Sequence, residues 1–210
     1  MSVTAPAVQA VIFDFDGVIA ERGFRAALRT LAARCGLDYA PLPARAMQAL
    51  VDSGYLTGRG SEQAWWEQLQ GELGPLGSCR QFRGDLLEAS VVRPWQLALA
   101  GRLAGAGYRT AVLSDHTDWL DEIETRQPFG HAFGRVFNSY YLGASKRESA
   151  SFRAVLDALG TAPERSVFID DNPDNVARAA ALGMTGIVYR EREAFLRDLD
   201  ATLGGVLAGA

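Results

Sequence analysis

The feature that most constrains how this chain can fold is an apolar run that ends in two acids. The run extends from Ala7 to Phe13, broken only by Gln9, and leads directly into Asp14-Phe15-Asp16-Gly17-Val18. An apolar run of this length that ends near a glycine is typical of a strand buried on both faces. Alternate residues of a strand point to the same side, so Asp14 and Asp16 bring two carboxylates together. These acids repel each other unless one is protonated or a cation lies between them. Because placing two carboxylates at the end of a buried strand costs stability, their presence favours a functional site over a plain strand end.

The composition is that of a globular chain large enough for one domain with an insertion. The chain has 210 residues, of which 48% are hydrophobic and 22% are charged. Its net charge of −4 indicates no basic surface for nucleic acid. No apolar stretch approaches the length of about 18 residues that crosses a bilayer. We therefore expect neither a nucleic-acid partner nor a membrane partner.

The cysteines and the N-terminal residues favour a cytoplasmic protein. Cys35 and Cys79 have no metal-binding or redox spacing, and two free thiols suit a reducing compartment. The first residues show no basic segment followed by an apolar core, so no signal peptide is predicted. No pattern in the sequence sets an oligomeric state.

Strand and helix patterns alternate along most of the chain. After the first strand, we expect further strands over residues 108–113, 135–137, 165–169 and 185–189, with helical patterns between them. Residues 21–90 differ because they contain only helical patterns and turns, with Ser61 as an expected N-cap. The alternation predicts an α/β fold with a doubly wound parallel sheet. Residues 1–20 and 91–210 form the predicted core, and residues 21–90 form an inserted helical domain.

Side chains that can carry chemistry gather where the predicted strands end. They are Asp14 and Asp16 after the first strand, Ser114 after the second, Lys146 in the loop after the third, and Asp170 with Asp171 after the fourth. Open parallel sheets bind their ligands at the carboxyl ends of the strands. We therefore expect these side chains to form one site.

This set of residues suits a phosphate ester as substrate. Several carboxylates in one site require a cation, and ligands that are all oxygen favour Mg²⁺. A metal beside a lysine and a hydroxyl suits a bound phosphate group. One aspartate can attack phosphorus and form an aspartyl-phosphate, while a second acid protonates the leaving oxygen. Lys146 and Ser114 would hold the phosphoryl oxygens as their charge redistributes.

The four motifs resemble, in order and spacing, those of the haloacid dehalogenase (HAD) superfamily of phosphohydrolases. They are Asp14-Phe15-Asp16-Gly17-Val18, Ser114, Lys146 and Asp170-Asp171. The resemblance implies a Rossmann-like core, a small helical cap formed by the insertion, and Mg²⁺ as cofactor. Residues 167–175 are most similar to the branch that contains sugar-phosphate phosphatases and the phosphatase domain of bifunctional epoxide hydrolases. The implied activity is hydrolysis of a small phosphate monoester, such as a sugar phosphate.

The resemblance also implies roles for the acids. Asp14 would be the nucleophile and a magnesium ligand. Asp16 would be the general acid and base, and its backbone carbonyl would contact the metal. Asp171 would reach magnesium directly or through water, while Asp170 is left open as an alternate or indirect ligand. Family dehalogenases usually lack the second acid of the first motif, so Asp16 favours phosphoryl chemistry.

The remaining implied roles concern substrate binding. Gly17, Ser114, Asp115 and Lys146 are the expected substrate-binding residues, and Lys146 would hold phosphate and nucleophile together. Two neighbours depart from the family pattern. Many relatives have an asparagine where this chain has Asp115, and a proline is common where it has Arg147. Both departures concern the rim of the expected site, so the substrate of a relative is a weaker guide to the substrate of this chain.

Three other functions remain compatible with these residues. A phosphomutase of the same superfamily uses the same groups but returns the phosphoryl group to a sugar. A phosphoacceptor signalling domain also pairs acids with Ser and Lys on a parallel sheet, although the helical insertion and the two acids of the first motif argue against it. A relative that only binds partners is the third, and the presence of every reacting group argues against it.

Overall fold

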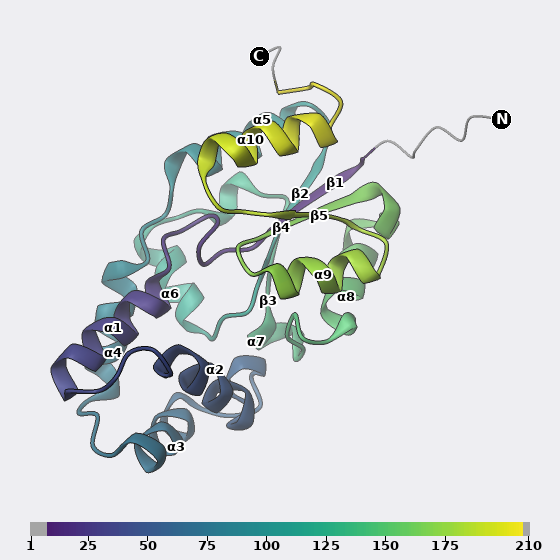
Figure 1. Cartoon of the computed structure of the whole chain (residues 1–210). Coiled ribbons are helices and arrows are strands. Elements are labelled where there is room, and N and C mark those ends of the chain that lie inside the picture. The colour runs from purple at the N-terminus through teal and green to yellow at the C-terminus, as the bar shows by residue number, and fades with distance from the viewer. Residues whose placement is uncertain (1–7, 208–210) are drawn as a thin grey trace.

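The predicted strands form a single parallel sheet. In the computed structural model, which describes residues 8–207, the strand order is β3-β2-β1-β4-β5 (Figure 1). The strands are β1 (Ala10–Phe13), β2 (Arg109–Ser114), β3 (Arg135–Asn138), β4 (Ser166–Asp170) and β5 (Thr185–Val188). All neighbouring strands run parallel, so the predicted α/β fold with a doubly wound sheet is confirmed. Ala7, where the predicted first strand begins, lies outside the described residues.

The central position of β1 explains its apolar sequence. All four of its residues are buried, because β2 and β4 flank it and helices cover both faces of the sheet. Val11 and Phe13 pack with α5 (Pro94–Gly105) and α10 (Arg192–Thr202). Ile12 points to the opposite face and packs with α8 (Ser149–Leu159) and α9 (Pro173–Ala181), as the two layers of Figure 1 show.

The register of the sheet aligns the C-terminal ends of β1, β2 and β4, where the predicted site residues lie. Phe13 pairs with Val112 of β2 and with Ile169 of β4. The residues that follow β1 therefore lie level with the ends of β2 and β4. This edge of the sheet is the one at which parallel α/β folds bind ligands.

Residues 23–89 form only helices and turns. They contain α1 (Gly23–Cys35), α2 (Leu42–Asp52), the 3-10 turn η1 (Tyr55–Thr57), α3 (Glu62–Leu73) and α4 (Cys79–Ala89). We call this segment the helical insertion; it lies beyond the carboxyl ends of the strands in Figure 1. Ser61 caps α3 as predicted, because its hydroxyl accepts a hydrogen bond of 3.2 Å from the Ala64 amide. Trp65 and Trp66 lie in an apolar cluster that continues into the sheet core.

The two connections between sheet and insertion run side by side. Ala20 and Val92 form an antiparallel bridge, and the Arg93 amide donates to the Ile19 carbonyl at 2.8 Å. The Arg93 guanidinium donates to the carbonyls of Gly17 and Val18, both at 2.8 Å. These bonds hold the start of α1 against the site.

The structure differs from the sequence-based prediction in a few elements. After β3 the chain forms α7 (Ser139–Leu142), a short helix that was not predicted; Asn138 caps it by accepting from the Tyr140 amide. The second helix begins at Leu42, and Pro43 fits its first helical turn. The remaining helix is α6 (Trp119–Arg126). Within the described residues, no helix is both long and apolar enough to span a bilayer.

Candidate active site

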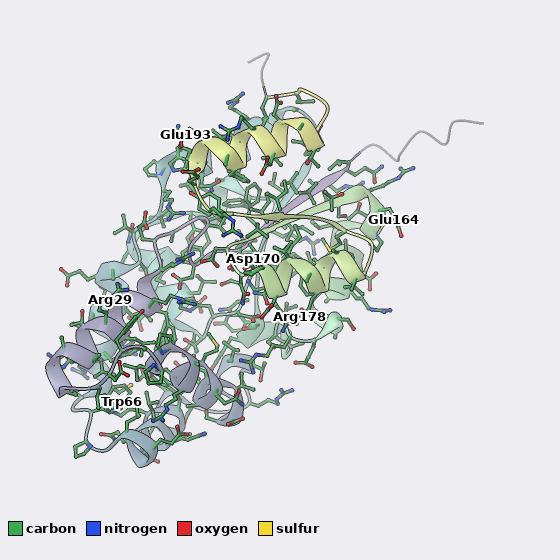
Figure 2. The ribbon with its side chains drawn as sticks, viewed as in Figure 1. Arg29, Trp66, Glu164, Asp170, Arg178 and Glu193 are labelled. Carbon is green, nitrogen blue, oxygen red and sulfur yellow. The ribbon has the colours of Figure 1, made fainter. Side chains whose placement is uncertain are left out.

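A buried lysine joins two acids at the carboxyl ends of the strands. The Nζ atom of Lys146 lies 2.7 Å from Oδ1 of Asp14 and 2.7 Å from Oδ2 of Asp170. The exposed fractions are 1% for Lys146, 6% for Asp14 and 0% for Asp170, which Figure 2 labels near the centre of the molecule. Lys146 is also the only lysine in a chain with 21 basic residues. The structure therefore brings Lys146, Asp14 and Asp170 together, as the positions of the strand ends predicted.

The neighbouring charges shift the pKa of Lys146 and the pKa of Asp14. Burial lowers the pKa of Lys146, but the charges of Asp14, Asp170 and Asp115 together raise it above its usual value. Burial and the neighbouring Asp170 raise the pKa of Asp14, and Lys146 offsets part of that rise. The lysine therefore stays protonated inside the protein, where it can hold an anionic group against Asp14.

The loop after β4 fixes the orientation of Asp170. Its Oδ1 accepts from the Asn172 amide at 2.8 Å, and its Oδ2 accepts from the Asn175 side chain at 3.1 Å. Asn172 also caps α9 by accepting from the Asp174 amide, and Pro173 occupies the first turn of that helix. Asn175, in the first turn of α9, is a contact that sequence analysis missed.

Asp16 lies beneath the start of α1. Its Oδ1 accepts a hydrogen bond of 2.8 Å from the Gly23 amide. Burial raises the pKa of Asp16 to about 7, although the Gly23 hydrogen bond lowers it in part. A carboxyl group with such a pKa can both give and take a proton near neutral pH.

Asp171 and Gly17 approach each other closely on the other side of the site. A Cβ atom on Gly17 would lie 2.5 Å from Oδ2 of Asp171, and the φ of Gly17 is 95°. Both facts require glycine at this position. Asp171 also forms an ion pair of 2.5 Å with Nε of Arg22.

The residues that follow β2 lie on the opposite side of Lys146. Asp115 accepts a hydrogen bond of 2.8 Å from the Lys146 amide through its Oδ1, and burial raises the pKa of Asp115. Ser114 is buried at the end of the strand, level with Asn138 of β3. His116 is buried as well, and burial lowers its pKa to about 4, so it is neutral at pH 7.

Three of the acids are close enough to share a cation. Asp14, Asp170 and Asp171 each offer one carboxylate oxygen, and these oxygens lie within 4.8 Å of one another. Octahedral Mg²⁺ has ligands at about 2.1 Å, so opposite ligands are about 4.2 Å apart, and the upper limit on these separations is close to that value. The carboxylate of Asp16 is not one of the three.

A cavity of about 440 Å³ opens above these acids. Its lining includes the predicted residues Asp14, Asp16, Asp115, Lys146 and Asp171, but not Gly17 or Ser114. A smaller chamber of about 40 Å³ adjoins it, and both are bounded by Asp16, Asp115, Phe24 and Met47. The chamber is otherwise mostly apolar, with Leu50, Leu56 and Trp119 among its walls.

Four arginines on the cavity wall were not predicted as site residues. They are Arg22, Arg25, Arg147 and Arg178, the last of which Figure 2 labels on α9. Arg22 follows the first motif closely, so its proximity was a usable signal. Arg25 and Arg178 lie on helices whose orientation depends on packing, and no local pattern distinguishes them from other surface arginines.

Comparison with known proteins identifies the family. A family model described as haloacid dehalogenase-like hydrolase matches residues 8–183. The chain therefore belongs to the haloacid dehalogenase-like hydrolases, and it is an enzyme of the hydrolase class. The resemblance inferred from the four motifs is confirmed.

Relatives of this chain include both a protein of similar length and much longer proteins. It is 29% identical over 217 residues to the phosphoglycolate phosphatase of Rhodospirillum rubrum, covering 94% of this chain and 85% of the relative. It is 30% identical over 130 residues to bifunctional epoxide hydrolase 2 of Rattus norvegicus, covering 59% of this chain and 23% of the relative. A match to drimenol cyclase drtB of Aspergillus calidoustus is 38% identical over 72 residues, or 34% of this chain and 14% of the relative. The chain thus spans less than a quarter of the length of the two longer relatives.

Solved structures share the fold. A HAD family enzyme from Bacteroides thetaiotaomicron, solved in complex with magnesium and inorganic phosphate, superposes with a TM-score of 0.69 at 18% identity, covering 90% of this chain and 99% of that one. A HAD-like family hydrolase from Porphyromonas gingivalis superposes with a TM-score of 0.71 at 23% identity, covering 92% and 98%.

Proposed function

We propose that this hydrolase is a magnesium-dependent phosphatase that cleaves a small phosphate monoester through an aspartyl-phosphate. The observation that carries the proposal is the contact of 2.7 Å between Lys146 and Asp14 at the base of the cavity. A buried ammonium group beside a carboxylate is suited to hold a phosphoryl group against its nucleophile.

The residues support a two-step reaction. An oxygen of Asp14 attacks phosphorus, and the bond from phosphorus to the leaving oxygen breaks while Asp16 gives that oxygen its proton. Asp16 then takes a proton from water, which attacks the same phosphorus and releases inorganic phosphate and free Asp14. The pKa of Asp16, raised by burial to about 7, supports both transfers near neutral pH. Lys146 balances the charge on the phosphoryl oxygens throughout, and we assign the buried Ser114 to the same group.

The acids around Asp14 fit a magnesium ion. We assign it to Asp14, Asp171 and the backbone carbonyl of Asp16, with Asp170 as an alternate or indirect ligand. Bound there, magnesium would neutralise the negative charge of the phosphate and orient it. The triad of carboxylate oxygens and the magnesium in the neighbouring Bacteroides structure support this assignment.

The helical insertion is proposed to act as a cap over the cavity. Phe24 and Met47 from the insertion line the cavity, and the Ser139 hydroxyl donates to the Leu56 carbonyl at 2.8 Å. A closed cap would exclude bulk water from the attack on phosphorus. Substrates would enter when these contacts open.

The relatives support the substrate class. The Rhodospirillum relative, which aligns with 94% of this chain, is named as a phosphatase of phosphoglycolate, a small phosphate monoester. We therefore propose a small phosphate monoester here too, with sugar phosphates in the same size class.

The first test is phosphate release from a panel of small phosphate esters, with magnesium and with chelator. We expect magnesium-dependent release by the wild type and at least a thousandfold loss of kcat in Asp14→Asn, because the nucleophile is removed. Substantial release by the variant would contradict the role of Asp14. If a folded wild-type protein released nothing, product analysis with a sugar bisphosphate primer would test the mutase, and a long-lived phosphorylated protein would indicate a phosphoacceptor.

A further inference from the structure

The cavity has cations that the proposed reaction does not use. Three of its arginines already have side-chain partners: Arg22 pairs with Asp171, Arg178 donates to Asn175 at 2.9 Å, and Arg147 donates to Gln48 at 3.3 Å. The guanidinium of Arg25 has neither a hydrogen bond nor an ion pair with any residue among 8–207. Its five donors therefore remain available to a ligand.

Arg25 and Arg147 face the cavity from different parts of the fold. Arg25 lies in the first turns of α1, whereas Arg147 directly follows Lys146 in the loop before α8. Both are exposed, so neither is neutralised by burial among acids. The bond from Arg147 to Gln48 of α2 is weak at 3.3 Å, and a charged ligand would form stronger hydrogen bonds with the same guanidinium.

The floor of the cavity already accounts for one phosphate group. Lys146 lies beside Asp14 there and is assigned to that phosphate group, so the arginines would be surplus for a substrate with a single anionic end. A planar guanidinium group can donate to two oxygens of one carboxylate or phosphate at the same time. A hydroxyl group offers only one oxygen. Phe24 and Met47 supply apolar surface on the same cavity wall, suited to a short carbon linker.

We propose that Arg25 and Arg147 bind a second anionic group, carried by the leaving alcohol of the substrate. The substrate is then a small phosphate ester with a carboxylate or a second phosphate a few bonds from the ester oxygen. This inference rests on the proposed phosphatase function and narrows its substrate class.

The test compares kcat/KM for pairs of esters that differ in the second charge. One pair is 2-phosphoglycolate and its neutral amide, 2-phosphoglycolamide; the other is ethane-1,2-diol bisphosphate and the monophosphate. The wild type should prefer the charged member of at least one pair by tenfold or more, and the better pair distinguishes carboxylate from phosphate. Arg25→Gln and Arg147→Gln should each reduce that preference about tenfold, mainly through KM.

The matched control is Arg153→Gln on the exposed face of α8, which should keep the wild-type preference. Calorimetric titration of the preferred ester into Asp14→Asn, with and without Arg25→Gln, measures the same contact without turnover. Equal kcat/KM for both members of each pair would overturn the inference. The inference would also be overturned if Arg25→Gln lowered kcat/KM equally for the charged and the neutral member of a pair. Such a result would show that Arg25 attracts the ester phosphate and does not bind a second anionic group. Absence of release from every ester would instead overturn the phosphatase function itself.

Discussion

Lys146 keeps its charge inside the protein because two acids hold it from opposite sides. Its contacts with Asp14 and Asp170 replace the water that a buried ammonium group loses. The same arrangement makes the acids depend on the lysine, because without it two carboxylates would lie unpaired in a buried site. The only lysine of the chain is thus a structural element as well as a proposed catalytic one.

The first residue-scale prediction concerns this charge. Lys146→Met should lower the free energy of unfolding by about 3–5 kcal/mol at pH 7, because it leaves buried acids without their counter-ion. Urea unfolding measures the loss. Adding Asp170→Asn should recover part of it, since one unpaired charge is removed. A single variant as stable as wild type would show that the acids do not need the lysine.

A second residue-scale prediction concerns His116. Its folded pKa is about 4, below the ordinary value of 6.5, because the ring is buried. The unfolded chain therefore takes up this proton first as the pH falls, and stability is lost between about pH 6.5 and pH 4. A shift of this size corresponds to about 3 kcal/mol. Asp16 and other acids titrate over the same range in both proteins, so the quantity to measure is the difference in unfolding free energy between wild type and His116→Gln. That difference should change by about this amount between pH 7 and pH 4; identical pH dependence of the two proteins would refute the prediction.

At the scale of elements, the two connections between sheet and insertion act as one unit. Arg93 bonds two carbonyls of the first connection and pairs with Glu21 at 2.9 and 3.0 Å. The Gln127 side chain donates to the Ser90 carbonyl at 2.7 Å and accepts from the Val92 amide at 3.0 Å. A few charged and amide side chains therefore tie the two connections together.

We predict that Arg93→Gln weakens this unit more than the rest of the fold. Losing hydrogen bonds from a charged group should cost about 1–3 kcal/mol. Hydrogen exchange should quicken at the amides of Gly17, Ala20 and Glu21, which lie in the first connection. Arg197→Gln on the exposed side of α10 serves as control. Unchanged exchange in the first connection would show that backbone pairing alone holds it.

On the scale of the whole molecule, the insertion and the sheet meet at a second place besides the connections. Trp119 of α6 donates to Glu62 of α3 at 2.9 Å, and Arg59 donates to the Gly143 carbonyl at 3.1 Å. Tyr55 of η1 donates to Asp118, which precedes α6. Together with the continuous apolar cluster, these contacts hold the insertion over the cavity.

Metal binding should therefore report on the stability of the whole fold. A ligand that binds only the folded state adds about 2.7 kcal/mol at a concentration one hundred times its Kd. Saturating magnesium should raise the thermal midpoint, and chelator should reverse the rise. Asp171→Asn should remove most of the effect, while Asp198→Asn on α10 should keep it. A full magnesium effect in Asp171→Asn would contradict the proposed ligand set.

The amino-acid sequence determined the elements and the edge of the sheet at which the site lies. Apolar runs, caps such as Ser61 and Asn172, and glycine stops depend on interactions between near neighbours, so they can be read without the fold. The acids at the strand ends follow from the same patterns, because strands in one parallel sheet must end together. The family follows from the order of those motifs.

Tertiary structure alone decided how distant residues meet. Three such contacts join residues far apart in sequence: the burial of Lys146 between Asp14 and Asp170, the shared cavity wall of Arg25 and Arg147, and the hydrogen bonds of Arg93 to the first connection. Such contacts depend on how helices pack on the sheet and on the insertion, and packing sums many weak interactions that no local pattern encodes. For that reason the sequence predicted a phosphate site with Arg147 at its rim, whereas the presence of Arg25 in the same cavity became visible only in the fold.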